Sequence, residues 1–386
     1  MNLKALPGLS GSYSTRLLRG VLAVSMGVFL LACAGVSDKP TPPELGLNPA
    51  LFGIGQAWST KVGAVALPLD VNVSGNTISV ASSEGSLAVI DASTGSDVWR
   101  ANLGEPIAAG VGSDGKYVAV VTRSNELVLF EAGRELWREK LGALSFTAPL
   151  VAGARVFTLS ADRAVTAFDA QSGRKLWRQI RPGEPLVLRQ AGVLQAVDDT
   201  LVVGLSGRLV GMSPLNGSIR WEAPVAISRG TNEVERLVDL VAKVSRQRDV
   251  VCTRAFQAAV ACVNVTRGTV LWSKPAFGSE GVHGDERSLY GTESDGKVIA
   301  WRRTDGERTW VSEQLKFRGL TAPLALGRSV VVGDDTGLVH FLSREDGSPL
   351  NRLSTDGSAI AAAPVLAGNT LVVVTRSGGV FGFRPE

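Results

Sequence analysis

The feature that most restricts how this chain can fold is a short phrase that recurs along it, in which a glycine lies four residues before a tryptophan. One copy is DAQSGRKLW at 169–177, and similar phrases occur at 91–99, 264–272 and 302–310. A degenerate phrase that recurs along a chain indicates one structural unit used many times. The glycine and tryptophan pairs are Gly95 and Trp99, Gly133 and Trp137, Gly173 and Trp177, Gly217 and Trp221, Gly268 and Trp272, and Gly306 and Trp310.

The series extends to eight units when two imperfect copies are included. Trp58 opens it without a preceding glycine, and Gly347 closes it with Asn351 in the place of the tryptophan. From Trp58 to Asn351 the successive spacings are 41, 38, 40, 44, 51, 38 and 41 residues. Repeats of about 40 residues are typical of the blades of a β-propeller.

Each unit contains the residue pattern of short strands. Between Trp137 and Trp177, the segments ARVFTLS and AVTAFDA are apolar and β-branched, and a polar turn separates them. The phrase itself predicts a tight turn, in which the acidic side chain bonds the local backbone and the glycine accepts a positive φ. Short strands in this order predict an all-β fold, an eight-bladed β-propeller of four-stranded blades over residues 55–386. We expect the C-terminal segment GGVFGFRPE to pair with the strand around Trp58 and close the ring.

The N-terminus has the pattern of a secretory signal. Residues 16–33, RLLRGVLAVSMGVFLLAC, contain two arginines, a short uncharged apolar run, small residues and a cysteine. This order predicts a signal peptide over 1–32, and an uncleaved anchor is the alternative. The LLAC sequence resembles the lipobox of bacterial lipoproteins, which implies cleavage before Cys33 and acylation of that cysteine. Residues 33–54 are rich in proline, glycine and small residues, and we expect a tether there.

The net charge gives no support for a nucleic-acid partner. The full chain has 40 Lys and Arg against 36 Asp and Glu, but Lys4, Arg16 and Arg19 lie before Cys33 and no acidic residue does. Removing those three leaves 37 basic side chains against 36 acidic ones. A nearly neutral chain lacks the strong positive field that attracts nucleic acids.

Two cysteines lie close together in the second half of the chain. Cys252 and Cys262 are placed symmetrically about Gln257 in VVCTRAFQAAVAC, so a hairpin that turns at residues 256–258 sets them opposite each other. Two alternatives stay open, a structural disulfide formed in an oxidising compartment or a pair of small buried thiols.

The repeat resembles the PQQ-like repeat, which is found in eight-bladed quinoprotein dehydrogenases and in the BamB family of outer-membrane assembly factors. With the lipobox in front and eight repeats behind it, the whole chain is similar to the BamB family. This resemblance implies a non-enzymatic, lipid-anchored subunit of the β-barrel assembly machinery at the outer membrane, facing the periplasm. It also implies binding to the POTRA region of BamA and to other subunits, with unfolded outer-membrane proteins as further partners.

A periplasmic quinoprotein dehydrogenase that uses PQQ is the alternative function. The sequence contains no Cys-Cys dipeptide of the kind such enzymes carry, and its tryptophans recur at the repeat position, as structural residues do. The two histidines, His283 and His340, lie in different repeats without the spacing of metal ligands. We therefore expect no catalytic residue, cofactor or metal, and we expect His283 in an exposed loop.

The two longest spacings in the series are adjacent, which indicates two insertions on one part of the surface. The first insertion, at 181–197, carries Leu186 and Leu188 beside Arg189, and the second spans 228–249. Apolar side chains among charges are typical of a recognition patch. The alternative is that the leucines fold back under their own loop.

The BamB resemblance implies a role for both insertions. In that family the BamA-binding surface combines a Leu-x-Leu-Arg element with an acidic element that follows Asp/Glu-Arg-Leu. Where the family has a second acid two positions after the first, this chain has Val241. The matching positions here are Leu186, Leu188 and Arg189 in the first insertion and Glu235, Arg236 and Asp239 in the second.

Overall fold

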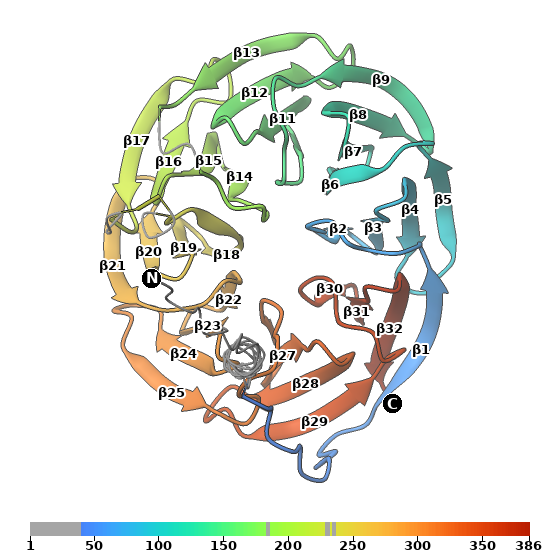
Figure 1. The fold of residues 1–386 in the computed structure, drawn as a ribbon, viewed down its shortest axis with the longest axis vertical. Helices are drawn as coiled ribbons and strands as arrows, with labels where there is room; N and C mark the ends of the chain where they lie inside the picture. Colours follow the sequence, from blue (N-terminus) through green and yellow to red (C-terminus); the bar gives the residue numbers. More distant parts are fainter. Residues whose placement is uncertain (1–39, 183–185, 228–231, 234–236) are drawn as a thin grey trace, which may run out of the picture. The chain divides into compact units, whose positions relative to one another are not determined.

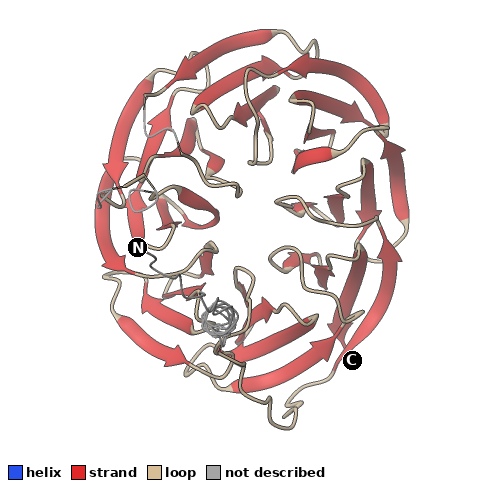
Figure 2. Ribbon diagram, viewed as in Figure 1, coloured by secondary structure: helices blue, strands red, loops and turns tan. Residues whose placement is uncertain are grey.

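The computed structural model describes residues 40–182, 186–227, 232–233 and 237–386. In these residues all regular secondary structure is β, and 32 strands form eight four-stranded sheets. Within the compact unit Pro42–Glu386, the sheets stand around a central opening as the blades of a propeller (Figure 1, Figure 2). The expected eight-bladed β-propeller is therefore confirmed.

Each blade is an antiparallel sheet whose first strand faces the central opening and whose fourth strand lies outermost (Figure 1). Blades 1 to 4 contain β2 (Asn72–Ser74), β3 (Thr77–Ala81), β4 (Ser86–Asp91) and β5 (Asp97–Asn102); β6 (Ile107–Ser113), β7 (Tyr117–Thr122), β8 (Glu126–Glu131) and β9 (Arg134–Lys140); β10 (Leu150–Ala152), β11 (Arg155–Leu159), β12 (Ala164–Asp169) and β13 (Lys175–Ile180); and β14 (Leu194–Val197), β15 (Thr200–Leu205), β16 (Arg208–Met212) and β17 (Ile219–Pro224). Blades 5 to 8 contain β18 (Leu240–Gln247), β19 (Val250–Ala255), β20 (Ala259–Asn264) and β21 (Thr269–Pro275); β22 (Val282–Gly284), β23 (Ser288–Thr292), β24 (Val298–Arg302) and β25 (Arg308–Ser312); β26 (Leu324–Leu326), β27 (Ser329–Gly333), β28 (Leu338–Ser343) and β29 (Pro349–Ser354); and β30 (Val365–Ala367), β31 (Thr370–Val374) and β32 (Gly379–Pro385) with β1 (Ile54–Lys61).

The ring closes by pairing the two ends of the propeller, as expected. β1 runs antiparallel to β32 as the outer strand of blade 8, with Trp58 opposite Gly382 and Lys61 opposite Gly379. The chain then continues from β1 into blade 1. Opening the ring at this point therefore requires a complete strand pairing to break.

The recurring glycine and tryptophan meet between neighbouring blades. The indole of Trp272 in blade 5 donates from Nε1 to the carbonyl of Arg303 in the β24–β25 turn of blade 6 (2.8 Å). Gly306 of the same turn has a φ of +72° and lies so close to this indole that a Cβ would be 2.7 Å from Cδ2. Each copy of the phrase therefore makes two contacts. Its glycine turn contacts the tryptophan of the blade before it, and its tryptophan contacts the glycine turn of the blade after it. We call each such contact between two blades a joint. Equivalent indole bonds run from Trp58 to Ala92, from Trp137 to Ala170, from Trp177 to Pro214 and from Trp310 to Arg344.

Buried apolar side chains fill the spaces between the blades. One cluster combines Val202 and Leu209 of blade 4 with Val251 and Val263 of blade 5. Middle strands such as β20 and β31 are buried along their whole length. Because both faces of these strands are covered by neighbouring blades, their sequences are mostly apolar and do not alternate.

The seventh copy of the phrase, which has Asn351 in place of tryptophan, binds the N-terminal segment instead. Nδ2 of Asn351 donates to the carbonyl of Phe52 (2.8 Å), and its Oδ1 accepts from Asn48 (3.1 Å). Phe52 packs edge to face on Phe341 of β28, with ring centroids 5.4 Å apart. This part of the expected 33–54 tether is thus held against blade 7, because both its backbone and its aromatic ring have partners there.

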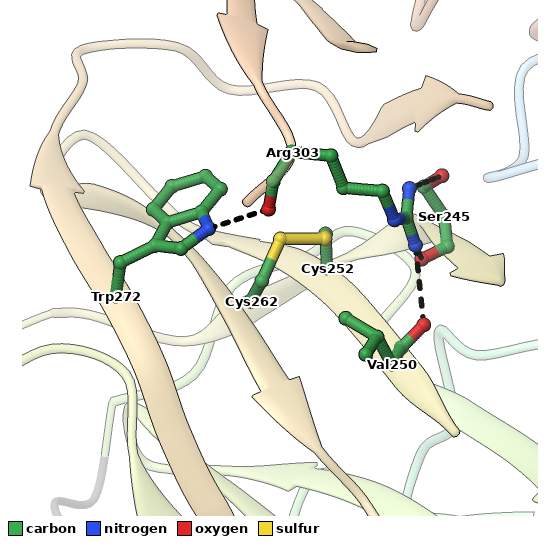
Figure 3. The surroundings of a disulfide bond; sticks show 6 residues. All are labelled: Ser245, Val250, Cys252, Cys262, Trp272 and Arg303. Atoms are coloured by element: carbon green, nitrogen blue, oxygen red, sulfur yellow. Dashed lines mark hydrogen bonds between the residues drawn. A yellow bond between two sulfur atoms is a disulfide. The ribbon is translucent and has the colours of Figure 1, made fainter. Parts of the chain in front are cut away.

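The structure contains a disulfide within blade 5. Cys252 of β19 and Cys262 of β20 are directly opposed in the sheet and bonded to each other (Figure 3). Nearby, the Arg303 guanidinium donates to the hydroxyl and the carbonyl of Ser245 (2.8 and 2.9 Å), while the Arg303 carbonyl accepts from Trp272 (Figure 3). Of the two alternatives for these cysteines, the structure has the disulfide, beside the joint between blades 5 and 6.

Candidate functional site

The described residues of both insertions that precede β14 and β18 lie on one face of the ring, which we call the loop face. The chain between β13 and β14 and the chain between β17 and β18 each join the outer strand of one blade to the inner strand of the next. Such connections run beside the hairpins between second and third strands. The N–H of Val225 donates to the carbonyl of Gly207 (3.0 Å), and the N–H of Leu103 donates to Gly85 (2.9 Å).

The first insertion presents the Leu-x-Leu-Arg element. The side chains of Leu186 and Leu188 are half-buried, whereas Arg189 is exposed. The Arg189 guanidinium lies over the ring of Phe146, 5.9 Å from its centroid, which is a cation–π distance. The leucines therefore fold back in part, and each keeps apolar surface open at the loop face.

Asp239 of the second insertion ties the two insertions together. Its Oδ2 accepts the backbone N–H of Leu188 (3.0 Å), and its Oδ1 accepts from Arg163 (3.3 Å). Arg163 is buried in the β11–β12 hairpin and also donates to the carbonyl of Leu186 (3.2 Å). Because charge-assisted bonds hold the backbone on both sides of Val187, the Leu-x-Leu-Arg element has a defined conformation.

Backbone contacts continue this link towards blade 5. Gly192 pairs with Val241 as an isolated antiparallel bridge, and the N–H of Ala242 donates to the carbonyl of Ala191 (2.9 Å). Oγ1 of Thr147 accepts the N–H of Gly192 (2.9 Å). The end of the first insertion is therefore bound both to the loop before blade 3 and to the first strand of blade 5.

Some residues that the sequence singled out lie outside the described residues, namely Cys33, Glu235 and Arg236. Their expected roles stay predictions. In the described ranges, no helix has the length and apolar character that a membrane span requires. The described members of the expected partner site, which we call the loop surface, are Leu186, Leu188, Arg189 and Asp239.

A cavity of about 800 Å³ occupies the central channel at the loop face. Part of its wall consists of small residues from the connections that enter the inner strands, such as Ala66, Ala322 and Ala361. Arg189 and Gln190 of the first insertion also line it, so the channel and the loop surface adjoin. The spacing of the repeat gave no sign of this cavity, because its walls come from connections in different blades.

Charged side chains are concentrated in this channel cavity. Lys243 and Asp70 form an ion pair there. Burial raises the pKa of Glu280 to about 7, although the positive charges of Arg254 and Arg376 oppose the shift. The charged lining residues are Arg123, Arg189, Lys243 and Arg376 with Asp70 and Glu280.

Two of the channel cations had a signal in the sequence. The pentapeptide VVTRS occurs at 120–124 and again at 373–377, where it places Arg123 and Arg376 at the same position of two blades. Both arginines follow the second strand of their blade, β7 or β31, and both line the channel. The repeated pentapeptide therefore places two arginines at equivalent positions of the ring.

The two histidines make contacts within the propeller. His283 lies half-buried in β22, where Nδ1 accepts the N–H of Ala325 in the next blade (3.0 Å). The expectation of an exposed loop is wrong, because β22 is an inner strand. Burial and the nearby Lys243 lower the pKa of His283 to about 4. His340 is buried in β28, with Nε2 2.9 Å from Oδ2 of Asp334. Across the described residues, no three His, Cys, Asp or Glu side chains are arranged to hold a metal ion.

Comparisons with known sequences identify relatives of this chain. Residues 83–312 match the family model described as "Outer membrane protein assembly factor BamB". A protein of Burkholderia pseudomallei (strain K96243) named outer membrane protein assembly factor BamB is 38% identical over 363 residues, which cover 92% of this chain and 94% of the relative.

Comparisons with solved structures support the fold. The crystal structure of BamB from Moraxella catarrhalis matches with a TM-score of 0.79 at 24% identity and covers 86% of this chain and 99% of its own. Quinohemoprotein alcohol dehydrogenase from Comamonas testosteroni matches with a TM-score of 0.67 at 15% identity and covers 89% of this chain and 79% of its own. The propeller fold is thus shared by assembly factors and enzymes, and the family is decided by the sequence match. On that match, this chain belongs to the BamB family.

Proposed function

We propose that this protein is a non-enzymatic scaffold subunit of the outer-membrane β-barrel assembly machinery, and that it binds the POTRA region of BamA through the loop surface. Membership of a family named for outer-membrane protein assembly supports this role. The observation that carries the binding site is the Asp239 carboxylate, which joins both insertions into one surface. Glu235 and Arg236 are proposed as further contacts from the sequence alone.

The geometry of the loop surface suits a protein partner. A surface that is ordered before binding loses little conformational entropy when the partner docks. Leu186 and Leu188 offer apolar surface for a groove, and the exposed Arg189 offers a guanidinium that can meet a carboxylate. Asp239 acts differently, because its two carboxylate oxygens already bind Leu188 and Arg163. It is a positioning residue for the Leu-x-Leu-Arg element.

The double variant Leu188→Glu with Arg189→Glu tests this site. Hot-spot side chains cost about 1–3 kcal/mol each when they are removed, which is roughly fivefold to over a hundredfold in affinity. We expect the variant to lose co-purification with BamA from solubilised outer membranes. Leu215→Glu is the matched control, because Leu215 is an exposed leucine in the β16–β17 turn on the opposite face, and this variant should bind normally.

Circular dichroism and the melting temperature establish whether each variant folds. A folded double variant that still binds BamA with unchanged affinity refutes the site. Loss of folding together with binding would show that Leu188 belongs to the core. Asp239→Asn should weaken binding less than Leu188→Glu does, because it loosens the element without removing its contacts.

We also propose that residues 1–32 are removed and that Cys33 is then acylated, which anchors the protein to the outer membrane on its periplasmic side. Replacing residues 1–33 with a cleavable secretory signal peptide that lacks a lipobox should release a soluble, folded protein into the periplasmic fraction. Mass spectrometry of the unaltered protein that finds residues 1–32 still attached would favour an uncleaved anchor.

The scaffold proposal is separated from the quinoprotein alternative by an activity assay. Purified protein that receives PQQ, Ca²⁺, an alcohol and a dye acceptor should show no turnover. Saturable oxidation of the alcohol would make the protein a quinoprotein dehydrogenase instead.

A further inference from the structure

The cavity in the central channel has the size and wall chemistry of a ligand site. Its volume of about 800 Å³ falls in the range of about 300–1,000 Å³ that is usual for ligand pockets. Leu67, Ile107 and Phe146 contribute apolar side chains to its wall. Charges beside an apolar wall interact more strongly with a ligand than charges on an open surface do, because less water screens them.

Three guanidinium groups meet at this cavity from separate parts of the chain. Arg123 follows β7 in blade 2, Arg376 follows β31 in blade 8, and Arg189 lies in the first insertion. All three side chains are exposed. In the ranges that the structure describes, none of the three has a carboxylate oxygen within 4.0 Å. These cations are therefore available to a ligand.

The acidic side chains of the cavity do not balance these cations. Asp70 is already paired with Lys243. Glu280 is the other acid, and its Oε1 accepts from Gln190 (3.5 Å). Since burial raises the pKa of Glu280 to about 7, this side chain carries only part of a negative charge near neutral pH. The cavity has an excess of positive charge.

We propose that the central channel is a carboxylate-binding site that takes an acidic, partly apolar peptide segment or a small organic acid. Guanidinium groups bind carboxylates in a bidentate geometry, and the apolar wall accepts the aliphatic part of such a ligand. Cations on blades 2 and 8 and on the first insertion can hold more than one carboxylate at once. The site goes beyond the proposed binding of BamA, because Arg123 and Arg376 are not part of the loop surface.

The test is isothermal titration of the detergent-solubilised, full-length protein with the peptide acetyl-Glu-Leu-Glu-Leu-Glu-amide. We expect saturable binding with a Kd below about 1 mM that weakens when salt is added. The matched peptide with Gln at each Glu position should bind at least tenfold more weakly. Equal binding of the two peptides, or no saturable binding of the acidic peptide, overturns the proposal.

Variants of the protein locate the binding. The double variant Arg123→Gln with Arg376→Gln should bind the acidic peptide at least tenfold more weakly than the unaltered protein does. Arg134→Gln should leave its affinity unchanged, because Arg134 is an exposed arginine at the start of β9 on the opposite face. Full binding by the channel double variant overturns the proposal. BamA co-purification is measured on the same samples, so that failure of the BamA proposal is seen separately.

Competition experiments distinguish the sources of the carboxylate. Citrate that displaces the peptide at similar concentrations supports a small organic acid as the ligand, and failure of citrate to compete supports a peptide segment. If inorganic phosphate displaced the bound acidic peptide at concentrations similar to the Kd of that peptide, the carboxylate assignment would be overturned.

Discussion

A single added methyl group at the joint between blades 5 and 6 should destabilise the propeller strongly. In Gly306→Ala, the new Cβ would lie 2.7 Å from Cδ2 of the Trp272 indole, well inside van der Waals contact. Trp272 is only 8% exposed. It also donates to the Arg303 carbonyl, so the indole cannot move aside without losing this hydrogen bond.

The expected cost of Gly306→Ala has three parts. An alanine in the left-handed region costs about 1–2 kcal/mol, and φ is +72° at this position. Overpacking against a buried side chain adds about 1–3 kcal/mol, and loss of the indole hydrogen bond adds about 1 kcal/mol. The free energy of unfolding should therefore fall by about 3–6 kcal/mol.

Gly104→Ala is the matched control for backbone strain. Gly104 has a φ of +71°, and an added Cβ there meets no atom within 4 Å. This variant should lose only about 1–2 kcal/mol. Urea unfolding of both variants, compared at equal m-values, measures the difference. Equal losses of unfolding free energy in the two variants would refute the steric account of the joint. The same account predicts that Gly306→Ala costs less in a protein that already carries Trp272→Ala, and an unchanged cost there would also refute it.

Two further predictions concern acid stability and the disulfide. Burial opposes ionisation of Asp334, but hydrogen bonds from His340 and from the N–H of Leu338 outweigh it and lower the pKa to about 2. This pKa lies below the value of about 3.9 that an Asp has in the unfolded chain. The ionised carboxylate therefore stabilises the fold above pH 4 by about 2 kcal/mol, and this contribution is lost as the pH falls from about 4 to about 2. Asp334→Asn should flatten this part of the pH profile of urea unfolding, and an unchanged slope would contradict the assignment. Replacing Cys252 and Cys262 with alanine should lower the free energy of unfolding by about 3 kcal/mol, since the disulfide closes a short loop. Thiol titration of the unfolded, unreduced protein should find neither cysteine reactive.

The sequence was sufficient to predict the fold because the two residues that make each joint, a glycine and a tryptophan, both recur in it at a regular spacing. A glycine that requires positive φ and a tryptophan four residues later, repeated at the spacing of a blade, leave few architectures that pack each indole against the next unit. The departures at the ends of the series were harder to interpret. Asn351 marked an imperfect repeat, but its bonds to Asn48 and Phe52 join segments that are far apart in the chain. No local pattern predicts such a contact.

The candidate site was predictable in its position and not in its internal bonding. Unusual spacings placed both insertions next to each other, since neighbouring repeats become neighbouring blades. The sequence grouped Asp239 with residues expected to contact a partner, whereas the structure bonds its carboxylate to Leu188 and Arg163. Arg163 lies in an ordinary hairpin of blade 3, and nothing in its local sequence distinguishes it from other turn arginines.

The two faces of the ring have different constraints, and this explains where functional residues can appear. The joints use the turns between third and fourth strands, so a change there disturbs the packing of two blades. The loop face carries the connections between blades, which can lengthen or gain charge without altering a joint. Arg123 and Arg376 occupy equivalent hairpins of blades 2 and 8, which flank blade 1 in the closed ring. Ring closure therefore brings two copies of one short sequence motif, from opposite ends of the propeller, to the same cavity.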